Sequence, residues 1–176
     1  MAHHPLPFKP LKKITWDSVP GQLLLRLIEN KIAVFSHHTA FDSAATGINQ
    51  QLADALGLQN VKPLVACEDP VDSMDALGSG RYGQLPSPTS LGQIAESLKQ
   101  FLQIHVVRHA GIPKMSVDKV AIACGSAGSF LSAARRQGCD LFVTGETNDF
   151  SYLSRSRSHR HRLALDWALC ERAICL

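Results

Sequence analysis

The sequence has no long hydrophobic run, few aromatic residues (6%) and little net charge for its 176 residues. No apolar stretch reaches the roughly 18 residues that a membrane-spanning helix needs, so no membrane span is predicted. The N-terminus shows no charged and apolar regions of the kind that form a secretory signal peptide. The formal charge is only +3, and the basic residues cluster near the C-terminus, at Arg155, Arg157, Arg160 and Arg162. The composition therefore does not predict a nucleic-acid-binding face.

Cysteine is also scarce, odd in number and scattered, at Cys67, Cys124, Cys139, Cys170 and Cys175. This distribution does not resemble a disulfide framework. Cys124 and Cys139 lie in apolar segments and are expected to be small buried side chains. A reducing, cytoplasmic setting fits these features, and the 45% hydrophobic content is enough for a real core.

Short apolar segments of strand length alternate with segments of helical periodicity, which predicts an α/β fold of mixed sheets with helices on their faces. The expected strands cover residues 32–36, 61–67, 105–110, 119–124 and 139–144. The expected helices cover residues 21–30, 47–56, 90–102 and 129–137. Ser90 and Gln93 have the spacing of a capping box at the start of the third helix. Residues 69–88 are rich in Gly, Pro and Ser and are expected to be mostly loop.

Two histidine clusters carry the most distinctive chemistry. His3 and His4 precede a proline, and His38 and Asp42 are four residues apart, directly after the expected strand at 32–36. Imidazole binds zinc, iron, copper and nickel, and a carboxylate can bridge two ions. Because ligands of open α/β sheets bind at the carboxyl ends of strands, these groups could converge on metal. For either cluster taken alone, an incidental or solvated histidine pair is the alternative.

Several further motifs follow one another in a particular order. They are His3-His4-Pro5-Leu6-Pro7-Phe8, His38-Thr39-Ala40-Phe41-Asp42 with Gly47-Ile48-Asn49, Gly78-Ser79-Gly80-Arg81-Tyr82-Gly83-Gln84-Leu85, Gly125-Ser126-Ala127-Gly128-Ser129, and Val143-Thr144-Gly145-Glu146. In this order the motifs resemble the dinuclear-metal-centre proteins related to the yeast Ngg-interacting factor, often labelled GTP cyclohydrolase I type 2 homologues.

The resemblance implies that His3, His4, His38 and Asp42 are metal ligands, with the Asp42 carboxylate bridging two divalent ions of zinc, iron or manganese. It also implies a two-lobed fold, a toroidal homohexamer and metal-dependent hydrolysis of a small-molecule substrate. A non-catalytic metal-binding oligomer that regulates or binds a partner protein is the alternative. A third possibility is a gene product without function.

Other polar groups allow two interpretations or match no family ligand. The loop Gly125–Ser129 could bind an anion through backbone N–H groups or simply form a tight turn, and it lacks the Lys-Ser/Thr ending of a P-loop. Glu146 could face a metal cleft or be a structural carboxylate. His37, His105 and His109 match no ligand position of the family.

The C-terminal region departs from the family pattern, so we divide the chain into a partial metal-binding domain, 1–148, and an aberrant tail, 149–176. The family's Gly-His and Ser/Thr-Glu ligands are missing there. With suitably chosen codons, a one-base shift turns residues 166–175 into Thr-Gly-His-Tyr-Ala-Ser-Glu-Arg-Phe. We therefore hypothesise a one-base insertion near Asn148. Sequencing the gene tests this, and a codon series without that alternative frame refutes it.

The family also carries a helix and strands ahead of the His-His motif, so the chain resembles an N-terminally truncated, incomplete version of the two-lobed fold. Exposed sheet edges invite non-specific pairing, and we expect the chain to be poorly soluble. Light scattering that detects a monodisperse hexamer would contradict this. The metal site is expected to be incomplete and to hold clearly less than two equivalents of metal.

Overall fold

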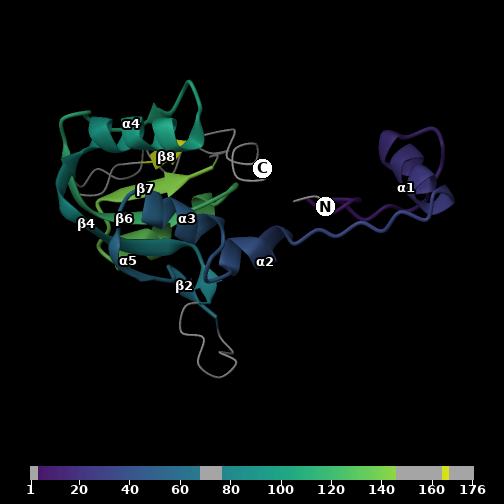
Figure 1. Ribbon diagram of the computed structural model, residues 1–176, viewed down its shortest axis with the longest axis horizontal. Helices are drawn as coiled ribbons and strands as arrows, with labels where there is room; N and C mark the ends of the chain where they lie inside the picture. Colours follow the sequence, from purple (N-terminus) through teal and green to yellow (C-terminus); the bar gives the residue numbers. More distant parts are fainter. Residues whose placement is uncertain (1–3, 68–76, 146–163, 167–176) are drawn as a thin grey trace. The chain divides into compact units, whose positions relative to one another are not determined.

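The computed structural model describes residues 4–67, 77–145 and 164–166 and has a mixed α/β fold, as the sequence predicts (Figure 1). The chain divides into two compact units, Met1–Phe41 and Asp42–Leu176, and the division falls inside one short helix. Among the described residues, no helix is both long and apolar enough to cross a membrane.

The main element of the first unit is helix α1 (Val19–Glu29). The Ser18 hydroxyl accepts a hydrogen bond from the Gly21 N–H at 3.3 Å, and a proline occupies the first turn, where no N–H is needed. This confirms the helix expected at 21–30. Gly21 is the one buried residue among those described between residues 4 and 41. The helix is therefore defined by its cap and its local sequence more than by a core.

The strand expected at 32–36 is wrong. Residues 32–35 belong to no helix or strand, and Ser36 makes only an isolated bridge. The apolar side chains of Ile32 and Phe35 are 57% and 66% exposed. A strand is stabilised by hydrogen bonds to a neighbouring strand, and the described part of this unit contains none. Instead of following a strand, His38 and Asp42 lie in helix α2 (His38–Ser43).

The second unit is built on a sheet with the order β1-β4-β6-β7-β8-β5. β6 pairs in parallel with β7 and β7 with β8, whereas the other neighbours are antiparallel. A separate short sheet pairs β2 with β3. The strands are β1 (Gln59–Lys62), β2 (Val65–Ala66), β3 (Gly78–Ser79), β4 (Arg81–Ser90), β5 (Arg108–His109), β6 (Ser116–Ala123), β7 (Leu141–Thr144) and β8 (Ala164–Asp166).

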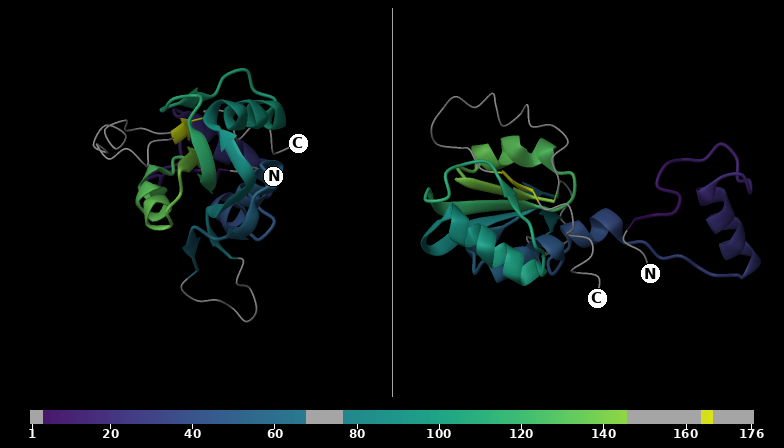
Figure 2. Two further views of the ribbon diagram at one scale, coloured as in Figure 1. Left: turned by 90° about the vertical axis from the view of Figure 1, so that its left-hand side faces the viewer. Right: turned by 90° about the horizontal axis from the view of Figure 1, so that it is seen from above.

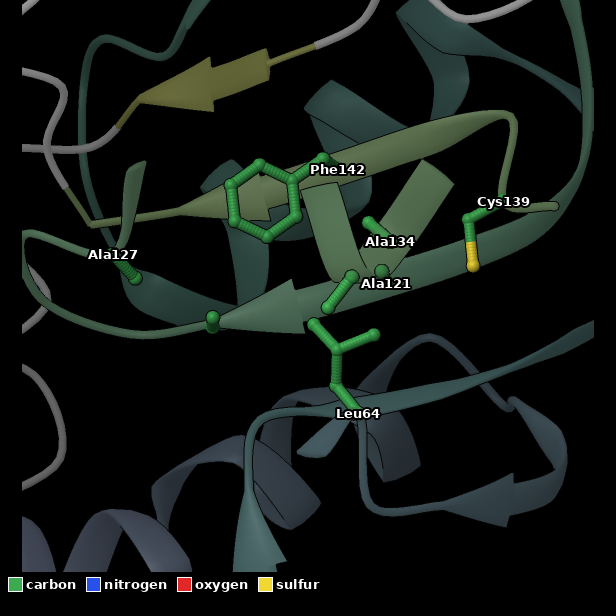
Figure 3. Close-up of a cluster of buried hydrophobic side chains, with 8 residues drawn as sticks. Leu64, Ala121, Ala127, Ala134, Cys139 and Phe142 are labelled. Carbon is green, nitrogen blue, oxygen red and sulfur yellow. The ribbon is translucent and has the colours of Figure 1, made fainter. Parts of the chain in front are cut away.

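Helices cover both faces of this sheet. Helices α3 (Ile48–Ala55) and α4 (Leu91–Leu102) lie on one side, and α5 (Leu131–Arg136) lies on the other, after the turn η1 (Gly128–Phe130) (Figure 2). Ala121 and Phe142 belong to a buried cluster with Ala134 and Cys139 (Figure 3). Successive residues in a strand point to opposite faces, so both faces of β7 and of the second half of β6 are buried. This explains why these segments appear in the sequence as continuous apolar runs.

Most of the remaining predicted elements are confirmed, some with changed bounds. Helices α3 and α4 match 47–56 and 90–102, and α4 has the predicted capping box. In that box the Ser90 hydroxyl accepts from the Gln93 N–H at 3.4 Å, and the Gln93 side chain accepts from the Ser90 N–H at 3.1 Å. η1 and α5 together account for 129–137, and β6 and β7 account for 119–124 and 139–144. Only Arg108–His109 of the strand expected at 105–110 is formed, as β5.

Prolines explain two errors of the strand and loop predictions. The strand expected at 61–67 is divided at Pro63 into β1 and β2, because proline has no N–H to donate. Residues 81–88 were expected to be loop but belong to β4. Pro86 and Pro88 fall where the pairing of β4 with β6 shifts register, between Gln84 and Thr89, so the ladder does not need their N–H groups.

Candidate metal centre

Helix α2 carries two of the four predicted ligands. His38 is its first residue and Asp42 follows four residues later, a spacing that places two side chains on the same face of a helix. His38 has a φ of 26°, in the region that residues other than glycine rarely adopt. Such backbone outliers cluster at functional sites, which makes His38 a notable position before any ligand is considered.

His4 joins His38 within the first unit. Their ring centroids are 5.0 Å apart, and the Phe8 ring lies 5.2 Å from His4 and 5.9 Å from His38. An aromatic ring beside two imidazoles restricts the rotamers that they can adopt. The structure thus brings together two predicted ligands that are 34 positions apart in the sequence.

His37 belongs to a different group of rings although it is adjacent to His38. Its centroid lies 4.9 Å from that of Phe41 and 6.1 Å from that of Phe35. The two adjacent histidines therefore have different surroundings, and only His38 is beside His4. His105 and His109, which match no ligand position of the family, are exposed.

The second unit holds Asp42 through its backbone. The Asn49 side chain donates from Nδ2 to the Asp42 carbonyl oxygen at 2.8 Å, and its Oδ1 accepts from the Cys124 N–H at 2.8 Å. Cys124 directly follows β6, so the end of α2 is tied to the carboxyl end of a central strand. In the sequence, Asn49 stood out only as part of the motif Gly47-Ile48-Asn49. A polar residue on the apolar side of a helix was the signal that could have indicated its structural role.

Arg81 holds the turn that follows α2. The side chain is 1% exposed, and it donates from Nη2 to the Ala44 carbonyl at 2.7 Å and from Nε to Gln50 Oε1 at 3.0 Å. Its Nη1 donates to the carbonyls of Gly78 and Gly80 at 2.8 and 2.7 Å. Burial lowers the pKa of Arg81. No sign of this role is visible in the sequence, because a single arginine in a glycine-rich segment does not indicate burial.

The glycine-rich loop after β6 packs closely against the end of β7. Thr144 Oγ1 donates to the Gly125 carbonyl at 3.1 Å, and a Cβ at Gly145 would lie 2.7 Å from the Gly125 nitrogen. Gly125 itself has a φ of +73°, which glycine adopts without strain. These contacts favour the tight-turn interpretation of Gly125–Ser129 over an anion site.

The donor types fit a divalent metal. Two imidazoles and a carboxylate are ligands suited to zinc, iron or manganese. In the described part of the chain, however, no three His, Cys, Asp or Glu side chains form a group that could hold one ion. His3 and Glu146 lie outside the described residues, as does most of the tail assigned to 149–176. From that tail, Ala164–Asp166 forms β8 beside β7.

Comparisons with known proteins agree on one family. The family model described as Duf34/NIF3 (NGG1p interacting factor 3) matches residues 1–169, a range that includes part of the tail. The chain is 35% identical over 147 residues to a GTP cyclohydrolase 1 type 2 homolog of Clostridium perfringens, covering 84% of this chain and 55% of that protein. It is 30% identical over 175 residues to NIF3-like protein 1 of Drosophila melanogaster, covering 98% and 57%.

The fold agrees as well. The crystal structure of a Bacillus cereus protein related to NIF3 superposes with a TM-score of 0.81 at 23% identity, covering 97% of this chain and 72% of that one. The chain spans a little over half the length of the two relatives matched by sequence. With a matching family model, matching relatives and a matching fold, the chain belongs to the Duf34/NIF3 family.

Proposed function

We propose that this chain binds divalent metal ions through His4, His38 and Asp42, with His3 as a further ligand, and that the bound metal serves hydrolysis of a small nucleotide-like substrate. The observation that carries the proposal is the pair of imidazoles, whose ring centroids are 5.0 Å apart although one is near the N-terminus and the other opens α2. Asp42 follows His38 by four residues in α2. The substrate class rests on relatives named GTP cyclohydrolase 1 type 2 homolog.

The chain's own residues supply the donors and their orientation. The Phe8 ring lies beside both His4 and His38, and Asn49 holds the backbone at Asp42. When bound, a divalent ion polarises a substrate oxygen and lowers the pKa of a coordinated water, so that a hydroxide nucleophile is available near neutral pH. Because an imidazole binds metal only in its neutral form, metal affinity should fall as the solution is acidified.

A non-catalytic role is the second candidate. No group of three ligating side chains is formed within the described residues, and an incomplete site can hold metal without turning over substrate. Under this second candidate function, the chain is a metal-binding or regulatory subunit of a homo-oligomer. The resemblance suggests a hexamer for either candidate.

Metal analysis of the purified chain tests the ligand assignment. We expect clearly less than two equivalents of zinc, iron or manganese by mass spectrometry, and a further loss in His38→Ala and Asp42→Ala. His37→Ala is the matched control, since His37 is adjacent in sequence but belongs to the other ring group. Two tightly bound ions in the unaltered chain would contradict the incomplete site. An unchanged metal content in His38→Ala would contradict the ligand set.

A turnover assay separates the two candidates. The metal-loaded chain is incubated with GTP and other nucleotides, and products are followed by chromatography. Hydrolysis that disappears in Asp42→Ala supports the enzyme. Metal binding without turnover of any nucleotide supports the non-catalytic subunit.

A further inference from the structure

Asn49 is a buried polar side chain in a position that an apolar residue would normally occupy. It belongs to α3, where the other buried residues are Ile48, Leu52 and Ala53, and it is 2% exposed. Buried polar groups are costly unless they are hydrogen-bonded. Both ends of the Asn49 amide are bonded, at 2.8 Å each, to backbone groups that are 82 residues apart in the sequence.

We propose that Asn49 is a positioning residue for Asp42: its amide joins the end of α2 to the carboxyl end of β6 and so fixes the direction in which the Asp42 carboxylate leaves the backbone. The proposal rests on the proposed function, in which Asp42 is a metal ligand. The positioning role goes beyond the proposed ligand set, because Asn49 does not bind metal itself and acts only through the backbone of Asp42.

The chemistry of the two partners requires an amide. The Asp42 carbonyl needs a donor, and the Cys124 N–H needs an acceptor, and an asparagine side chain offers one of each. An aspartate in place of Asn49 would still accept from Cys124 but would turn a second oxygen toward the Asp42 carbonyl. The substitution Asn49→Asp therefore keeps the size of the side chain and the bond from Cys124, and it replaces the bond to Asp42 by a repulsion between two oxygens. It also adds a negative charge, which the matched control below adds as well.

Arg81 bonds the same segment two residues further along the chain. Its guanidinium donates to the carbonyl of Ala44, which is two residues after Asp42. It also donates to Oε1 of Gln50, which is next to Asn49 in α3. The backbone that follows the candidate ligand is thus bonded at two points to the sheet and to α3. Such partners usually matter for metal affinity: their loss typically weakens binding by about 10- to 100-fold.

A double-mutant cycle on zinc affinity in the full chain tests the proposal. Zinc binding is measured by competition with a chelator for the unaltered chain, Asn49→Asp, Asp42→Asn and the double variant. Gln51→Glu is the matched control. It makes the same amide-to-carboxylate change in the same helix, at a side chain that donates to the Thr46 carbonyl at 3.2 Å rather than to that of Asp42. Far-UV circular dichroism checks that each variant is folded, and Asn49→Ser replaces Asn49→Asp if the latter is not.

We expect Asn49→Asp to weaken zinc binding at least about tenfold, and to have little further effect once Asp42 is already Asn. Gln51→Glu should leave zinc affinity unchanged. An equal loss in both backgrounds would overturn the proposal, because Asn49 would then act independently of Asp42. A normal affinity in Asn49→Asp, with a loss in Asp42→Asn, would overturn it while leaving the proposed function intact. If Asp42→Asn and His38→Ala both bind zinc normally, the proposed function itself fails, and the positioning role falls with it.

Discussion

The two units of this chain differ in what stabilises them. In the first unit, large apolar side chains are exposed, among them Val19 at 69%, Phe35 at 66% and Ile28 at 65%. In the second unit, both faces of the central strands are buried, and residues such as Leu52, Leu98 and Ile122 are fully inaccessible. A segment of 41 residues buries too little surface for a core of its own, whereas the longer second unit can bury one.

It follows that the candidate chemistry and the packing are separated along the chain. The paired imidazoles, whose ring centroids are 5.0 Å apart, belong to the first unit. The side chains that fix the backbone around Asp42 belong to the second unit and are among its most buried polar groups. Identical substitutions in the two units should therefore have very different effects, and three matched pairs test this. A fourth pair compares a buried with an exposed cysteine within the second unit.

The largest difference is expected between Phe142→Ala and Phe35→Ala. Phe142 is 3% exposed in the cluster of Figure 3, and its truncation should lower the free energy of unfolding by about 3–5 kcal/mol. Phe35 is mostly exposed, so its truncation should cost about 0.5 kcal/mol or less. Urea unfolding, monitored by circular dichroism, measures the free energy of unfolding of both variants. Similar losses would mean that Phe35 is covered in solution.

The second pair is Arg81→Met and Arg26→Met. Removing the buried guanidinium leaves backbone carbonyls without donors, at a cost of about 1–3 kcal/mol each for groups that water cannot reach. We expect a total loss of about 2–4 kcal/mol, because water can replace part of the bonding. Arg26 is exposed on α1, and its replacement should be nearly neutral. The same urea experiment checks the pair, and a neutral Arg81→Met would show that its hydrogen bonds are not needed for stability.

The third pair compares helix caps, Ser90→Ala and Ser18→Ala. Ser90 is part of a complete capping box on a helix packed against the sheet, and its loss should cost about 1 kcal/mol. Ser18 makes a single cap bond on a mostly exposed helix, so we expect about 0.5 kcal/mol or less. Because the second effect is local, hydrogen exchange in the first turn of α1 is the sharper measurement. Faster exchange in the first turn of α4 than of α1 would reverse the expected order.

The fourth prediction concerns the pH dependence of stability, an effect that is absent at neutral pH and appears only in alkaline solution. Burial raises the pKa of the Cys139 thiol from its ordinary value of 9.0 to about 11. The folded state therefore favours the neutral thiol, a contribution that is complete below about pH 9 and is lost as the pH rises through the folded value near 11. Cys139→Ala should remove this part of the alkaline loss of stability, while the same change at the exposed Cys67 should not. Unfolding free energies measured between pH 8 and about pH 11 decide it, and identical pH profiles for all three proteins would contradict it.

Local patterns in the sequence were enough to predict much of the second unit. The capping box at Ser90, the apolar periodicity of α4 and the continuous apolar runs of β6 and β7 each depend on neighbouring residues, so they are visible without a structure. The same holds for the two histidine clusters, because family motifs are short. The metal-ligand set of His3, His4, His38 and Asp42 stays a prediction.

The secondary-structure predictions failed where pairing with a distant segment decides whether a strand forms. Residues 32–35 have strand composition but no neighbouring strand among the described residues of their unit. Residues 81–88 have loop composition, but the first four of them pair with β1 and β6. Pairing is a property of two segments, and composition describes only one of them.

The amino-acid sequence was sufficient for the α/β class, the order of the main helices, the capping box at Ser90 and the family to which the chain belongs. The folded chain was needed to show that His4 meets His38, that His37 does not, and that Asn49 and Arg81 secure the backbone around Asp42. The physical reason is the range of the interactions. Caps and periodicity act over one or two turns of chain, whereas a buried amide or guanidinium joins groups that the sequence separates by tens of residues.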